Sequence, residues 1–129
     1  MVLGKQDLVL KIGNLQTERV VIDVRDCVNA YYKLMLNPDT KGMAFNVCGN
    51  DVHKMQHYTD LLIQKSGLLG VEQKIYEPFY RPIDIQVQVG DSSELTEMTG
   101  WKPEIPLEQT MEDLLSYWIS KLNNGNDIR

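Results

Sequence analysis

The sequence predicts an α/β protein with few strands and about four helices. Short runs rich in β-branched residues alternate with longer segments in which apolar residues recur at helical spacing. Gly, Asn and Pro stand between these segments, where turns and helix ends are expected. The convincing strands are too few to cover the edges and faces of a parallel sheet. We therefore expect either part of a larger α/β protein or a domain that covers its edges by dimerising.

The first half of the chain is expected to hold strands around one helix. Three apolar runs predict strands, at residues 8–12, 19–24 and 43–48. The carboxylate of Asp23 suits a helix N-cap, and Asp26 adds an acidic residue to the first turn. The pair Asn37-Pro38 ends this helix. Its apolar residues recur at helical spacing, at Val28, Tyr31 or Tyr32, Met35 and Leu36.

The second half is expected to hold three helices and little sheet. A helix from about residue 51 to 66 ends at Gly67, and its apolar stripe consists of Met55, Tyr58, Leu61 and Leu62. A short strand at 73–76 and an extended segment at 77–90 follow. Asp91 caps a short helix over 91–99 that ends before Gly100. Pro106 opens the strongest helix, whose apolar face consists of Leu107, Met111, Leu114, Leu115, Trp118 and Leu122.

Composition and charge exclude several classes of protein. The 129 residues, 43% of them hydrophobic, suit one globular domain. A formal net charge of −5 argues against nucleic acid as a partner, because that function requires a basic surface. No apolar run approaches the roughly 20 residues that cross a bilayer, and the N-terminal residues lack the pattern of a signal peptide. Cys27 and Cys48 are too few for a disulfide framework, so we expect reduced thiols in a cytoplasmic protein.

No cofactor or metal is expected to bind this chain alone. Its nine glycines form no Gly-x-Gly-x-x-Gly turn and no Walker motif, the patterns that bring backbone amides to a phosphate. His53 and His57 are four residues apart, which suits one metal ion, but no third ligand stands at a recognisable spacing. A half-exposed helix face is the simpler interpretation of both histidines. The two cysteines are interpreted as small core residues rather than nucleophiles.

One pair of residues matches a catalytic pattern formally. Tyr117 and Lys121 form Tyr-x-x-x-Lys, in which the lysine lowers the pKa of the tyrosine for proton transfer. The pair lies near the end of the last helix, with no glycine-rich turn before it. We therefore interpret it as an ordinary surface pair on a helix.

The arginines are the more informative residues, because the chain has only four. Arg19 stands where a Gly-Asn-Leu turn enters a strand, and Arg81 precedes a proline that fixes the local backbone. An arginine held in this way offers a two-pronged donor to a phosphate, and Asp84 can accept hydrogen bonds from hydroxyl groups. The alternative is a surface ion pair between Arg81 and Asp84 or Glu77, worth about 0–1 kcal/mol.

The order of these motifs resembles a known family. The matching segments are GNLQTERVVIDVRDCVNAYYKLM, FNVCGN and FYRPIDIQVQVGDSSELTEMTGWKPEIPLEQTMEDLLSYW. They look like the C-terminal, substrate-binding portion of extended short-chain dehydrogenases of the GDP-mannose 4,6-dehydratase and GDP-4-keto-6-deoxy-mannose reductase family. The short spacing between the second helix and the Arg-Pro motif makes the reductase the nearer relative.

This resemblance implies roles for three residues. It implies that Arg19 and Arg81 contact the diphosphate of a GDP-sugar and that Asp84 binds a sugar hydroxyl of the nucleotide. The segment with Trp101 is implied to be structural, and Asn46 is implied to end a strand that joins the cofactor sheet of the whole enzyme. Arg19 is followed by Val20, where the family has an aspartate.

The resemblance also implies that the substrate and the cofactor bind different parts of the whole enzyme. The family uses NADP, but the glycine-rich turn, the catalytic Ser or Thr and the catalytic Tyr-Lys pair of the N-terminal half have no counterpart in this sequence. We expect residues 1–122 to form the nucleotide-sugar-binding domain, with a polar, disordered tail at 123–129, and no turnover by this chain alone. Its partner would be the missing N-terminal half or a second copy. The alternative is a non-catalytic interaction domain that dimerises through an exposed sheet edge.

Overall fold

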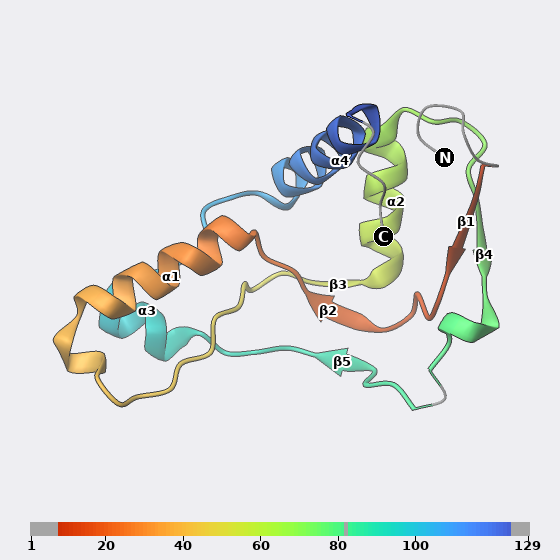
Figure 1. The fold of residues 1–129 in the computed structure, drawn as a ribbon. Helices are drawn as coiled ribbons and strands as arrows, with labels where there is room; N and C mark the ends of the chain where they lie inside the picture. Colours follow the sequence, from red (N-terminus) through yellow and green to blue (C-terminus); the bar gives the residue numbers. More distant parts are fainter. Residues whose placement is uncertain (1–7, 82, 125–129) are drawn as a thin grey trace.

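The computed structural model describes residues 8–81 and 83–124, which form a mixed α/β structure (Figure 1). Within these residues the α-helices are α1 Val24–Leu36, α2 Met55–Ser66, α3 Ser93–Thr99 and α4 Leu107–Asn123. The strands are β1 Val9–Ile12, β2 Glu18–Val20, β3 Val52–Lys54, β4 Glu72–Ile75 and β5 Val87–Gln88. Two short 3₁₀ turns, η2 Pro38–Thr40 and η3 Glu77–Phe79, complete the secondary structure. Four helices with few, short strands confirm the predicted fold class.

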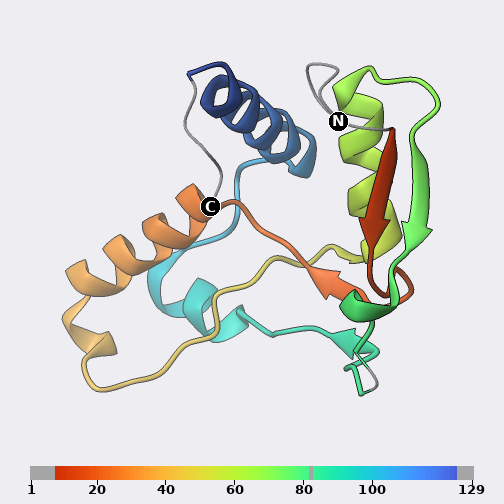
Figure 2. The same ribbon diagram turned by 45° about the vertical axis from the view of Figure 1, so that its right-hand side comes forward.

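The strands form two small sheets. Strands β1 and β4 pair in parallel, and α2 lies beside this pair (Figure 2). The second sheet has the order β3-β2-β5, with β3 antiparallel and β5 parallel to the central strand β2. This register sets Arg19 of β2 opposite His53 on one side and Gln88 on the other. The second sheet therefore joins three segments that are far apart in the sequence.

A small core joins α1, α3 and the segment that follows α3. Ala30, Leu95 and Trp101 are fully buried, and Ile22, Leu34, Phe45 and Val47 pack against them. The indole Nε1–H of Trp101 donates to the backbone oxygen of Asp26 at 3.0 Å. The buried carboxylate of Asp26 accepts from the backbone N–H groups of Glu104 and Ile105. These bonds fix the start of α1 against residues 101–105, so the structural role expected of Trp101 is confirmed.

The helix ends follow the predicted capping chemistry in most cases. The carboxylate of Asp23 accepts from the backbone N–H of Arg25 at 2.8 Å, which confirms the N-cap of α1. Gly67 and Gly100 end α2 and α3 with φ of 66° and 64°, the left-handed region that favours glycine. The expected cap at Asp91 is displaced by one residue, because Ser92 is the N-cap of α3 while Asp91 accepts from Ser93 N–H.

Further sequence predictions were wrong in their bounds or type. The strand expected at 19–24 ends at Val20, because Asp23 already caps α1. The second helix begins at Met55 rather than near 51, because residues 52–54 pair with β2 as a strand. Pro106 is the N-cap of α4 rather than its first helical residue. Residues 43–48, expected to be a strand, are extended but pair with no strand of the described chain.

Helix α1 has an unusual distribution of side chains. Its buried residues are Asp26 and Ala30, and Leu34 packs against the core, whereas most of its large apolar side chains face solvent. The exposed set consists of Val24, Val28, Tyr31, Tyr32, Met35 and Leu36, each between 56% and 75% exposed. Helix α4 buries Met111 but leaves Leu114 and Trp118 about two-fifths exposed. Among the described residues, no helix has both the length and the apolar character needed to span a membrane.

Residues 125–129, most of the tail expected at 123–129, lie outside the described residues. Asn123 is still part of α4 and Asn124 is its C-cap. The helix therefore runs one residue beyond the domain boundary expected at 122.

Candidate functional site

Two of the three predicted site residues meet in the structure. Nη2 of Arg19 donates to Oδ1 of Asp84 at 3.0 Å, and Nη1 donates to the backbone oxygen of Glu18 at 2.8 Å. The side chains of Arg19 and Asp84 are mostly buried, with 21% and 17% exposed. The partners are 65 residues apart in the sequence. The guanidinium group is thus held in one place, with part of its donor set still free.

The backbone around Arg19 is fixed from two sides. The hydroxyl of Tyr58 in α2 donates to the backbone oxygen of Arg19 at 2.8 Å. Burial raises the pKa of Tyr58, so this hydroxyl keeps its proton at neutral pH. On the other side, the backbone N–H of Glu18 donates to Gln86 just before β5. Tyr58, predicted only as part of an apolar helix stripe, therefore positions Arg19.

Arg81 lies elsewhere, on an exposed stretch between η3 and β5. Among the residues that the structure describes, it forms no ion pair and no side-chain hydrogen bond, so neither ion pair considered from the sequence is present. Asp84 pairs with Arg19 instead. The structure therefore joins Arg19 to Asp84 and leaves Arg81 in solvent.

A cavity of about 380 Å³ opens beside Arg19. Polar groups come from Arg19, Asn46 and Gln88, and the remaining lining residues are Val20, Val47, Cys48, Val89 and Gly90. Sequence reasoning missed Gln88, because it reaches the cavity only through the parallel register of β2 and β5. The cavity offers one cation and two neutral amides, a set that suits an anion carrying hydroxyl groups.

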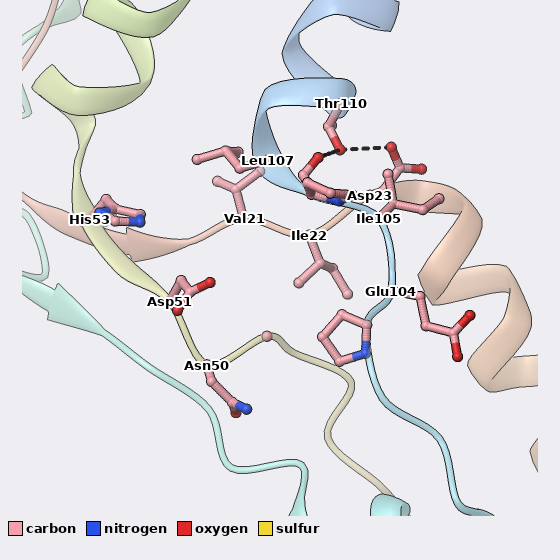
Figure 3. Close-up of a pocket in the computed structure, with 13 residues that line it drawn as sticks. Val21, Ile22, Asp23, Asn50, Asp51, His53, Glu104, Ile105, Leu107 and Thr110 are labelled. Carbon is pink, nitrogen blue, oxygen red and sulfur yellow. Dashed lines mark hydrogen bonds between the residues drawn. The ribbon is translucent and has the colours of Figure 1, made fainter.

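A second cavity, of about 200 Å³, lies between the start of α1 and the start of α4 (Figure 3). Asp23 lines it, and its carboxylate accepts from Arg25 and from the hydroxyl of Thr110, which at 2.8 Å is one of the dashed lines in the figure. Hydrogen bonds from the Arg25 side chain hold the pKa of Asp23 well below its usual range. Arg25 also reaches Asp113 of α4. Asp23 is a structural residue at the junction of α1 and α4, because its carboxylate is ionised and is held by Arg25 and Thr110.

The remaining candidates from the sequence do not gather into a site. His53 and His57 stack with ring centroids 4.2 Å apart, and among the described residues no group of three His, Cys, Asp or Glu side chains is placed to hold a metal ion. The ammonium group of Lys121 lies 5.0 Å from the centre of the Tyr117 ring, a cation–π contact on the ring face. Cys27 and Cys48 are half-buried free thiols.

The comparisons with known proteins identify the family. A family model described as GDP-mannose 4,6 dehydratase matches residues 1–114. The chain belongs to this family. GDP-6-deoxy-D-mannose reductase of Pseudomonas aeruginosa is 30% identical over 121 residues, which cover 92% of this chain and 38% of that protein. GDP-mannose 4,6 dehydratase 2 of Arabidopsis thaliana is 30% identical over 107 residues, 80% of this chain and 27% of the relative.

Solved structures agree with this assignment to the GDP-mannose 4,6-dehydratase family. A structure of RMD from Pseudomonas aeruginosa complexed with NADPH matches with a TM-score of 0.80 at 29% identity, over 92% of this chain and 38% of that one. UDP-glucose 4-epimerase of Thermotoga maritima matches with a TM-score of 0.73 at 21% identity, over 88% of this chain and 35% of that one, a likeness of fold alone. The chain therefore has the fold of part of an extended short-chain dehydrogenase and spans well under half the length of these relatives.

Proposed function

We propose that this chain is the substrate-binding part of an enzyme that modifies GDP-bound sugars, and that Arg19 and Arg81 contact the nucleotide diphosphate. The observation that carries the proposal is the guanidinium of Arg19, fixed by Asp84 at 3.0 Å at the side of a 380 Å³ cavity. Membership of the GDP-mannose 4,6-dehydratase family supports the choice of a GDP-sugar.

The charges and hydrogen-bond donors around Arg19 and Arg81 suit a diphosphate. Arg19 uses two of its five N–H donors on Asp84 and Glu18, so the others are available to phosphate oxygens. Arg81 adds a second cation from a proline-bounded loop. Oδ2 of Asp84 accepts no hydrogen bond within the described residues, so it can take a hydroxyl group of the nucleotide while Oδ1 keeps Arg19 in place. The ion pair with Arg19 offsets the negative charge of this carboxylate, which would otherwise repel the phosphates.

We infer that the residues described by the structure do not form a dinucleotide site by themselves. A pyrophosphate needs a glycine-rich turn between a strand and a helix, where backbone N–H groups are exposed. In the described residues β3 runs directly into α2 at Lys54–Met55, and α1 and α4 begin after Asp23 and Pro106. The turn between β5 and the seven-residue helix α3 holds a single glycine, Gly90. These helix starts do not fit the group. We infer that NADP, the family's cofactor, binds a part of the enzyme outside this sequence and that this chain alone gives no turnover.

The partners follow from the same proposal. We infer that residues 1–122 act together with the cofactor-binding part of an enzyme of this family. The alternative interpretation of the sequence, a non-catalytic domain that dimerises through a sheet edge, has one observation in its favour, since Ile75 at the β1–β4 pair is 65% exposed. A cytoplasmic location stays a prediction from the unpaired thiols of Cys27 and Cys48.

Calorimetric titration of the chain with GDP, GDP-mannose and UDP-glucose tests the proposal. We expect saturable binding of both GDP ligands, weaker binding of UDP-glucose, and loss of binding in Arg81→Ala. Lys41→Ala is the matched control, because it removes one exposed cation from the end of η2. The absence of binding by all three ligands, together with a dimer in light scattering, would favour the interaction domain.

A further inference from the structure

A second polar side chain, Gln88 of β5, lines the cavity beside Arg19. Gln88 and Arg19 are direct partners in the parallel pairing of β5 with β2, which are neighbouring strands in Figure 1. Partnered residues of neighbouring strands place their side chains on the same face of a sheet. Gln88 is exposed, and within the described residues its carboxamide forms no hydrogen bond, unlike the carboxamides of Gln56 and Gln73. The carboxamide of Gln88 is therefore available to a ligand that binds at Arg19.

Apart from Arg19, the side chains that line this cavity are uncharged. Gln88 and Asn46 contribute the carboxamides, and none of the described lining residues carries a carboxylate. A carboxamide has an acceptor oxygen and two N–H donors, so it can both donate to and accept from a hydroxyl group. The cavity therefore suits a ligand with an anionic group at Arg19 and a hydroxyl-bearing group next to it.

The end of the cavity beyond Gln88 is open because position 90 is a glycine. A Cβ atom on Gly90 would lie 2.8 Å from Sγ of Cys48 and 3.3 Å from its Cβ, and both residues line the cavity. A larger residue at position 90 would therefore have to displace Cys48. The volume of about 380 Å³ that remains lies within the range of small-molecule sites, which is about 300–1,000 Å³. Gln88 thus faces space that a ligand group can occupy.

Asp84 and Gln88 lie at opposite ends of the Arg19 side chain. The guanidinium end is paired with Asp84, which is not among the residues that line the cavity. The backbone end lies beside Gln88, which does line it. In a nucleotide sugar the diphosphate stands between the hydroxyl groups of the nucleoside and those of the hexose. With the diphosphate at Arg19 and the nucleoside at Asp84, the hexose extends into the cavity towards Gln88.

We propose that Gln88 is a specificity-determining residue, whose carboxamide binds hydroxyl groups of the hexose and makes the site prefer a GDP-hexose to free GDP. This inference rests on the proposed function. A site that hydrogen-bonds a ligand hydroxyl discriminates against a ligand that lacks it, because the polar group of the protein is then left unpaired. Arg19 contacts the diphosphate, which both ligands have, whereas Gln88 contacts a group that only one of them has. Loss of the carboxamide should therefore weaken the binding of one ligand and not of the other.

Calorimetric titration of the chain and its variants with GDP and with GDP-mannose tests this role. We expect the unchanged chain to bind GDP-mannose about tenfold more tightly than GDP. In Gln88→Leu the Kd for GDP-mannose should rise about tenfold, the change expected from one lost hydrogen bond, while the Kd for GDP stays the same. Gln88→Ala removes the same carboxamide without adding a large apolar side chain and should give the same result.

The matched control is Gln86→Leu. Gln86 is also exposed and lies two residues before Gln88, but it does not line the cavity. Its backbone oxygen accepts from the backbone N–H of Glu18, a bond that the substitution keeps. This variant should retain the tenfold preference for GDP-mannose.

Several results would overturn the role of Gln88. Equal affinity of the unchanged chain for GDP and GDP-mannose would mean that the hexose makes no favourable contact. A preference that survives in Gln88→Leu would mean that another residue makes this contact, and equal losses of affinity for both ligands would mean that Gln88 acts on the diphosphate end. In these cases GDP still binds the unchanged chain, so the proposed function stands. If the unchanged chain binds neither ligand, the proposed function is wrong, and the role of Gln88 is wrong with it.

Discussion

Replacement of Arg19 by lysine separates the geometry of the guanidinium group from its charge. Nη1 and Nη2 reach two acceptors in different directions, Glu18 O at 2.8 Å and Asp84 Oδ1 at 3.0 Å. A lysine ammonium keeps the positive charge but has a single nitrogen, so it reaches one of them at most. The other acceptor loses its hydrogen-bond donor, in a site where the side chains of Arg19 and Asp84 are only about one-fifth exposed.

The two expected effects have different sizes. Loss of one partly buried hydrogen bond should lower the free energy of unfolding by about 1 kcal/mol. Loss of the two-pronged contact to phosphate should raise the Kd for GDP about tenfold or more, which corresponds to about 1.4 kcal/mol. Thermal or urea unfolding measures the first effect, and calorimetric titration with GDP measures the second.

The matched control is Arg25→Lys, which also weakens a two-pronged ion pair but at the junction of α1 and α4. This control should lower stability and leave the Kd for GDP unchanged. If Arg19→Lys lowers stability while GDP affinity stays the same, Arg19 is a structural ion-pair residue and the proposed diphosphate contact is wrong. Equal losses of GDP affinity in both variants would point to general destabilisation instead.

Further variants test the packing and the charges of the fold. Trp101→Phe leaves the backbone oxygen of Asp26 without its buried donor and opens space beside Ala30, so chemical denaturation should show a loss of about 2–4 kcal/mol. The depressed pKa of Asp23 means that its carboxylate stabilises the fold above the unfolded pKa, so stability should fall as the pH drops below about 4. This part of the pH dependence should be absent in Asp23→Asn, and equal acid sensitivity of both proteins in urea titrations would contradict the assignment. Gly100→Ala places a side chain on a residue with φ of 64°, a conformation that favours glycine. The substitution should lower the free energy of unfolding by about 1 kcal/mol, which thermal unfolding measures as a lower melting temperature.

Local signals in the sequence predicted three of the helix ends correctly. The structure confirms the predicted caps at Asp23, Gly67 and Gly100. Each of these residues affects only the adjoining turn of its helix, so its effect can be predicted from the local sequence. The pairing of Arg19 with Asp84 was not predictable from the residues, because it depends on the parallel register of β2 with β5. The Arg19 contact to diphosphate itself stays a prediction.

The errors share a physical cause. Residues 43–48 have the composition of a buried strand, but a strand also needs a partner for its backbone, and the described chain provides none. The helical spacing in α1 predicted a helix correctly and carried no information about which side of it this chain would bury. In both cases the amino-acid pattern predicts a burial or a pairing that the described residues do not provide.

The three-segment sheet around β2 has a consequence for the order of folding. Helices α1 and α4 form through contacts between residues that are close in sequence. The Arg19 site instead requires residues 18–20, 52–54 and 84–88 to come together. Contacts between residues so distant in sequence form late, because the entropy of closing the long intervening loops must be lost first. A refolding chain should therefore regain its helical circular dichroism before it regains any affinity for a nucleotide.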